Sequence, residues 1–214
     1  MAYPTVDAPY GLKPVNLIGG LPFAGATRQL PIASNYGTSI FNGDVVELNA
    51  NGTVIITTTA GQAANAVVPG LVGVFLGCRY TDPTLGYELY SQHYPANTVA
   101  TDIVAYISDD PHALYKVVSV TSAAADNAAG GLLPAFKTRA VAGPPKNAVL
   151  VLNTGVLATG NSRMGCFANS VTTSLPLTVV DVVPDTANAA GTGFIELIVK
   201  FNVGYHRYNG QVGV

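Results

Sequence analysis

The chain has 214 residues, of which 49% are hydrophobic and only 10% charged, and its formal net charge is −2. Ordinary globular domains carry about 25% charged residues, so neutral side chains must cover much of this surface. Without a cluster of Lys and Arg, binding to nucleic acid or to an anionic membrane has no electrostatic support. The sequence also lacks the roughly 18 consecutive apolar residues of a membrane-spanning helix and the basic and apolar regions of a secretion signal.

The residue types that support metal binding and catalysis are scattered. The three histidines, His93, His112 and His206, stand in different segments without the HxH or HExxH spacing of a metal site, so we expect neither a metal nor another cofactor. Cys78 and Cys166 stand among apolar residues and glycines, which favours two buried thiols and leaves a disulfide open. Because no motif combines a nucleophile with a base, we expect no enzymatic activity.

The first 27 residues contain four prolines and four glycines, a density that excludes a regular helix. We therefore predict an extended N-terminal arm over residues 1–27 and a β-rich body over residues 28–214. Such an arm either lies across its own domain or reaches onto a neighbouring subunit. The apolar side chains that would anchor it to a partner are Tyr10, Leu12, Val15, Leu17, Ile18 and Phe23.

The segment 43–59 predicts a β-hairpin. Apolar residues alternate before and after Asn51-Gly52, a pair that favours the positive φ angles of a type I′ turn. The apolar run at residues 71–80, which includes two glycines, predicts a strand that is buried on both faces.

Two further strand-like runs, residues 101–107 and 112–120, flank the turn-forming sequence at 108–111, which predicts a second hairpin. Residues 121–131 have the composition of a short helix or a compact loop, and a second short helix is plausible near residue 61. The Pro-rich stretch 136–146 is the best internal break in the chain.

The C-terminal part contains the clearest strand pattern. Residues 194–208 alternate apolar and other side chains, and residues 177–183 precede them across a loop that can return the chain antiparallel. Short strands, long neutral loops and little helix together predict a mainly β protein, either an antiparallel β-sandwich or a β-barrel, with a β-tulip-like arrangement as a variant.

Tyrosines gather in residues 80–98. The eleven tyrosines of the chain include Tyr80, Tyr87, Tyr90 and Tyr94 in this segment. In one interpretation some of them pack in the core while the others line a long connecting loop. In the other, the segment is a binding loop, because long loops inside compact β domains are usually functional or disordered.

Three segments carry a resemblance to known proteins: DAPYGLKPVNLIGGLPFAGATRQLPIAS, GDVVELNANGTV with VVPGLVGVFLGCRY, and PLTVVDVVPDTANAAGTGFIELIVKFNVGYHRY. They resemble small structural proteins of tailed bacteriophages, especially marine and cyanobacterial phages. The GDVV strand, the Asn-Gly turn and the GLVGV strand are also similar to head-decoration proteins. Residues 120–165 carry the least resemblance.

The resemblance implies a capsid decoration, or cement, protein that binds the outer surface of the mature head. Its partners would be the major capsid protein and further copies of itself in a homotrimer, within a virion assembled in the host cytoplasm. We expect deletion of residues 1–27 to abolish capsid binding and to leave the body folded. The alternatives are another virion component of the head-to-tail junction or tail, and a carbohydrate-binding or adhesion β-sandwich that uses the tyrosine segment.

Overall fold

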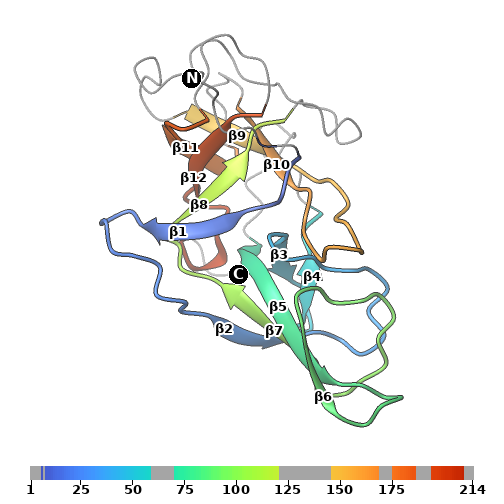
Figure 1. Ribbon diagram of the computed structural model, residues 1–214. Helices are drawn as coiled ribbons and strands as arrows, with labels where there is room; N and C mark the ends of the chain where they lie inside the picture. Colours follow the sequence, from blue (N-terminus) through green and yellow to red (C-terminus); the bar gives the residue numbers. More distant parts are fainter. Residues whose placement is uncertain are drawn as a thin grey trace.

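The computed structural model describes residue 6 and residues 8–58, 70–120, 146–168, 175–186 and 194–209. Two antiparallel sheets pack together in these residues, and neither is closed into a barrel (Figure 1). The helical structure in this part of the chain is the short 3-10 turn η3 (Arg207–Asn209). The prediction of a mainly β, sandwich-like fold with little helix is therefore confirmed.

The first sheet, sheet A, has six strands that come from both ends and the middle of the chain. In spatial order they are β1 (Lys13–Leu17), β8 (Ala113–Val118), β12 (Glu196–Phe201), β11 (Leu177–Val182), β9 (Lys146–Val151) and β10 (Gly165–Ala168). The second, sheet B, is built from the segment between β1 and β8. Its order is β2 (Arg28–Pro31), β7 (Val104–Ser108), β5 (Leu71–Thr81), β3 (Val45–Leu48) and β4 (Val54–Ile56), and β6 (Glu88–Ser91) pairs with the far end of β5.

The hairpin predicted at residues 43–59 is confirmed, but its turn differs from the prediction. Strands β3 and β4 pair antiparallel, with Leu48 opposite Val54, so five residues connect them. Gly52 has a positive φ of 77°. The Asn49 side chain closes the loop, because its Oδ1 accepts hydrogen bonds from the backbone N–H groups of Asn51 (2.9 Å) and Thr53 (3.0 Å). The loop is therefore not the two-residue type I′ turn that the Asn-Gly pair favours.

The strand predicted at residues 71–80 is β5, which lies at the centre of sheet B. It is flanked by β7 on one side and by β3 and then β6 on the other. Most of its side chains are buried, as the continuous apolar run predicts for a central strand.

The prediction of a second hairpin, from residues 101–107 and 112–120, is wrong. Strand β7 pairs with β2 and β5 in sheet B, whereas β8 pairs with β1 and β12 in sheet A. The predicted turn is present, since the N–H of Ala113 donates to the carbonyl of Asp110 at 3.1 Å. This turn carries the chain from one sheet to the other. Period-two patterning identifies a strand but does not identify its partner.

The C-terminal strands pair as predicted. Strands β11 and β12 are antiparallel, with Leu177 opposite Phe201. Leu197, Val199 and Phe201 of β12 are buried in the larger of the hydrophobic clusters. The predicted short helices at 121–131 and near residue 61, and residues 136–145 of the predicted break, lie outside the described residues.

The core joins the two sheets. The larger cluster combines side chains from sheet A with Val45, Leu71 and Val74 of sheet B, while a second cluster lies within sheet B and its loops. Backbone contacts also connect the sheets, for example from the N–H of Leu71 to the carbonyl of Tyr205 at 3.1 Å. Loops from both sheets meet at this junction.

Candidate functional site

The N-terminal segment is attached to the body at its base. The N–H of Gly11 donates to the carbonyl of Met164 at 3.1 Å, and the N–H of Leu12 donates to the carbonyl of Gly43 at 2.9 Å. The approach is so close that a Cβ on Gly11 would lie 2.5 Å from the Cβ of Ser162. Leu12 is fully buried in the larger core cluster. Residues 11 and 12 therefore belong to the packed body.

Tyr10 provides a second attachment. Its hydroxyl donates a hydrogen bond to Oε1 of Glu196, and Lys116 Nζ lies 3.0 Å from the same oxygen. Burial and the neighbouring Glu196 carboxylate raise the pKa of Tyr10 far above its usual value, so the hydroxyl stays protonated. Lys13 Nζ lies 4.2 Å from the centre of the Tyr10 ring. Tyr10 thus links the segment to β8 and β12.

Strand β1 and the turn after it form an edge hairpin, which we define as residues 13–23. Strand β1 pairs with β8 on its inner side. On its outer side the chain returns, so that the N–H of Leu17 donates to the carbonyl of Leu21 at 2.8 Å and Asn16 bridges Pro22. The turn extends away from both sheets at the left of Figure 1.

The edge hairpin exposes apolar side chains. The exposed fractions are 43% for Val15, 51% for Ile18 and 65% for Leu21. Monomeric proteins rarely expose contiguous apolar patches of large area, and such patches commonly mark contact surfaces. Leu21 was not among the predicted anchors, although it stands in the same apolar run.

The six predicted arm anchors therefore separate into two groups. Val15 and Ile18 are exposed, and Phe23 is partly exposed. Leu12 is buried in the chain's own core, and Leu17 packs against that core. Tyr10, as described, is bound to Glu196. Of the described residues of the predicted arm, Tyr10 and Leu12 are attached to the body, whereas Val15, Ile18 and Leu21 expose their side chains.

Because Leu12 and β1 belong to the packed body, deletion of residues 1–27 would damage the fold. Removing residues 1–27 would remove Leu12 from the core and β1 from sheet A, and would leave the edge of β8 uncovered. Loss of binding by such a truncated chain would then not distinguish a missing contact from a damaged fold. Substitutions at exposed positions of the edge hairpin are the cleaner test.

The tyrosine segment forms a second projecting element. Strands β5 and β6 make a tyrosine hairpin, residues 78–91, at the bottom of Figure 1. Tyr87 and Tyr90 are 54% and 70% exposed. Tyr80 and Tyr94 are buried in the core of sheet B, where the Tyr94 hydroxyl donates to the carbonyl of Tyr36 at 3.1 Å. The interpretation that some tyrosines pack in the core is thus confirmed for these two.

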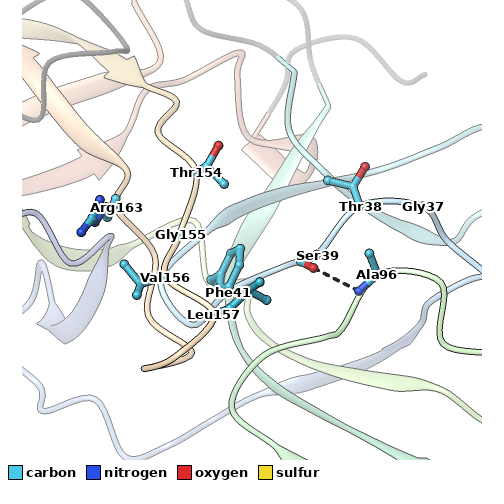
Figure 2. A pocket seen from close by; sticks show the side chains of 10 residues that line it. All are labelled: Gly37, Thr38, Ser39, Phe41, Ala96, Thr154, Gly155, Val156, Leu157 and Arg163. Carbon is cyan, nitrogen blue, oxygen red and sulfur yellow. Dashed lines mark hydrogen bonds between the residues drawn. The ribbon is translucent and has the colours of Figure 1, made fainter.

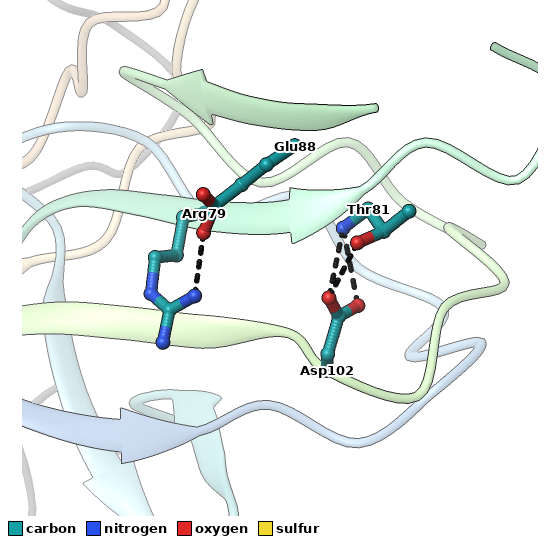
Figure 3. Close-up of polar contacts among 4 residues, drawn as sticks. All are labelled: Arg79, Thr81, Glu88 and Asp102. Atoms are coloured by element: carbon teal, nitrogen blue, oxygen red, sulfur yellow. Dashed lines mark hydrogen bonds and ion pairs between the residues drawn. The ribbon is translucent and has the colours of Figure 1, made fainter. Parts of the chain in front are cut away.

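Polar contacts on the surface hold the tyrosine hairpin (Figure 3). Arg79 NH1 lies 2.5 Å from Oε1 of Glu88 on the paired strand, which raises the pKa of the guanidinium. Asp102 accepts from the Thr81 N–H at 3.1 and 3.2 Å and from the Thr81 hydroxyl at 2.7 Å. These hydrogen bonds lower the pKa of Asp102.

A pocket lies where loops of the two sheets meet (Figure 2). Its volume is about 550 Å³. Residues 154–157 and Arg163 form one side, Thr38 and Ala96 the other, and the Phe41 ring lies between them. A smaller cavity of about 130 Å³ shares five lining residues with it and adds Asn153. Sequence reasoning missed this pocket, because three loops far apart in the sequence form it and no spacing links them.

Gly155 allows the Phe41 ring to pack closely against the backbone at the pocket. A Cβ at this position would lie 2.3 Å from the Phe41 ring. Asp44, three residues after Phe41, is fully buried and accepts a hydrogen bond from the Phe41 N–H at 2.8 Å. Burial raises the pKa of Asp44 to about 6, against a lowering contribution from Ser162 and the Phe41 backbone.

The described residues offer little for catalysis. Both cysteines are buried and unpaired, and burial raises the pKa of each thiol to about 12, which disfavours the nucleophilic thiolate. No group of three or more metal-binding side chains occurs in the part of the chain that the structure describes. Within the same residues, no helix has the length and apolar character to cross a membrane.

The chain was compared with protein-family models, curated proteins and solved structures. None of the three comparisons finds a match.

Proposed function

We propose that this chain is a structural protein of a tailed-phage virion that decorates the outer surface of the mature head. It binds the major capsid protein, bridges neighbouring capsid subunits and assembles as a homotrimer on the shell after synthesis in the host cytoplasm. Nucleic acid and membrane have no part in this role. The resemblance of the N-terminal segment, the GDVV strand and the C-terminal strands to decoration proteins supports the proposal.

The observation that carries the proposal is the exposure of Val15, Ile18 and Leu21 on the edge hairpin. Burying apolar surface against a partner contributes about 25 cal/mol per Å² removed from water. Because Tyr10 and Leu12 fix the base of the hairpin, these side chains are presented without the entropic cost of ordering a free arm.

A decoration protein stabilises the shell because many identical copies bind it. Each copy that binds the assembled shell, and not the dissociated subunits, shifts the equilibrium toward the shell. Contacts of modest affinity add strength when one trimer engages several sites at once. A surface with few charges suits this role, since charged residues are depleted at the centre of protein interfaces.

Cosedimentation with expanded heads that lack this protein tests the proposal. We expect saturable, stoichiometric binding of the full chain. Ile18→Asp and Leu21→Asp should each weaken binding at least tenfold, because a charge replaces an apolar contact. Circular dichroism should show unchanged folding, since both side chains point into solvent.

Val99→Asp is the matched control, because Val99 is similarly exposed, at 61%, but lies on a loop of sheet B. It should bind like the unchanged protein. Absence of binding by the full chain would contradict the proposal. If all three variants bind as tightly as the unchanged protein, the edge hairpin is not the contact surface, and the head must bind another part of the protein.

A second candidate function is favoured by the exposure of Tyr87 and Tyr90 on the tyrosine hairpin. Flat aromatic rings with a polar tip suit contacts to sugars as well as to proteins. A carbohydrate-binding protein would bind glycans as an isolated chain, and Tyr90→Ala would abolish that binding. If the protein binds glycans but does not bind heads, its function is adhesion and not decoration.

A further inference from the structure

The pocket between the two sheets has a charge that no group among the described residues neutralises. Arg163 is the charged residue among its lining residues, and it has no ion pair or hydrogen bond with the described residues. A guanidinium presents parallel N–H donors that match a carboxylate. Phe41, Val156 and Leu157 give the same pocket apolar walls. An occupant would therefore combine an apolar group with a carboxylate.

A second observation concerns the inner cavity. Asn153 is only 5% exposed, and neither its Oδ1 nor its Nδ2 has a hydrogen-bond partner among the described residues. An unsatisfied buried polar group costs about 1–3 kcal/mol. The outer pocket and the inner cavity share Thr38, Ser39 and Phe41 as well as Thr154 and Gly155, so they lie next to each other.

The unpaired donor and acceptor of Asn153 indicate that the ligand also carries a hydrogen-bonding group. A primary amide offers an acceptor and a donor, so it can pair with either the N–H or the C=O group of a peptide unit. A volume of about 550 Å³ lies within the range of sites for small ligands, roughly 300–1,000 Å³. Thr38 and Thr154 add hydroxyl groups to the lining.

We propose that this pocket binds the carboxylate end of a peptide, with the carboxylate on Arg163, an apolar side chain against Phe41, Val156 and Leu157, and a peptide unit toward Asn153. The ligand is either a free acylated amino acid or the C-terminus of a longer chain, because both present the same chemistry. The inference is independent of the proposed decoration function, since the pocket and the edge hairpin share no residue.

Titration of the full-length protein, followed by nuclear magnetic resonance, tests the proposal with three probes. N-acetyl-leucine carries the carboxylate, the amide and the apolar group, N-acetyl-leucinamide lacks the carboxylate, and acetyl-Ala-Ala-Leu extends the chain. We expect N-acetyl-leucine to shift the signals of residues 37–41 and 153–157, and N-acetyl-leucinamide to bind at least tenfold more weakly.

Arg163→Gln should weaken N-acetyl-leucine at least tenfold and leave N-acetyl-leucinamide unchanged. Lys200→Gln is the control, because it removes the same charge from β12, away from the pocket, and should leave both affinities unchanged. Asn153→Ala should weaken both probes alike, since both contain the amide.

The three-residue probe separates the two sources. Tighter binding of acetyl-Ala-Ala-Leu than of N-acetyl-leucine supports the end of a longer chain, and equal binding supports a free acylated amino acid. Equal affinity of the acid and the amide would overturn the proposal. So would unchanged binding in Arg163→Gln, or the absence of any shift at residues 37–41 and 153–157.

Discussion

The edge hairpin and the tyrosine hairpin both project exposed apolar or aromatic side chains, but they are attached to the body in different ways. The edge hairpin is fixed at its base by fully buried Leu12 and by Tyr10 on Glu196. The tyrosine hairpin is held along its length by exposed polar contacts, such as Arg79 with Glu88, over buried Tyr80. In both hairpins, residues close together in the sequence divide between the core and the exposed surface. Stability should therefore respond to the base and binding to the tip.

The largest expected effect comes from the base of the edge hairpin. Leu12→Ala should lower the free energy of unfolding by about 2–5 kcal/mol, because it removes a fully buried side chain and leaves a cavity where the two sheets meet. Ile18→Ala, at the exposed tip, should change it by less than about 0.5 kcal/mol. Urea unfolding of both variants measures the difference. Equal effects would show that base and tip do not differ in this way.

Asp44, which follows the Gly43 that binds Leu12 at the base of the edge hairpin, should make stability depend on pH. The pKa of Asp44 is raised to about 6 in the folded chain, so the folded state holds this proton more tightly than the unfolded state. Its contribution to stability therefore falls as pH rises from about 4 to about 6, and the cost persists above that window.

Asp44→Asn removes the charge and keeps an acceptor for the Phe41 N–H. We expect the variant to be more stable than the unchanged protein by about 1–3 kcal/mol at pH 7.5, because one pKa unit corresponds to about 1.4 kcal/mol. Near pH 4 the two proteins should have similar stability. Thermal unfolding across this pH range measures the gap, and a gap that stays constant with pH would contradict the assignment.

The smallest expected effect comes from the tyrosine hairpin. Glu88→Gln removes the ion pair with Arg79, and exposed ion pairs contribute little because water and salt screen them. The thermal midpoint of unfolding should stay unchanged in low and in high salt. A large loss of stability would show that the tyrosine hairpin, like the edge hairpin, depends on a single attachment.

Much of the fold could be predicted from the sequence where the signal is local. The alternation along β12 and the Asn-Gly pair after β3 identify strands and a hairpin, because side chains alternate between faces along a strand. The partner of β8 could not be predicted. The turn before it joins two sheets, and strand pairing depends on the whole fold.

The candidate site was harder to predict for a physical reason. The pairing of β1 with β8 shifts register between Pro14 and Asn16. Such a shift exchanges the two faces of a strand, so even-numbered Leu12 and odd-numbered Leu17 both face the core, while Val15 is exposed. Apolar character alone could not separate them. The pocket at Arg163 had no sequence signal, since its lining residues come from three separate loops.

We propose that the edge hairpin contacts a capsid shell. The most direct measurement is electron cryo-microscopy of expanded heads saturated with the full-length protein. We expect density for the protein on the outer surface at three-fold or quasi-three-fold positions, with Ile18 and Leu21 at the contact with capsid subunits. Bound copies whose edge hairpin faces solvent, or heads that carry no additional density, would contradict the account.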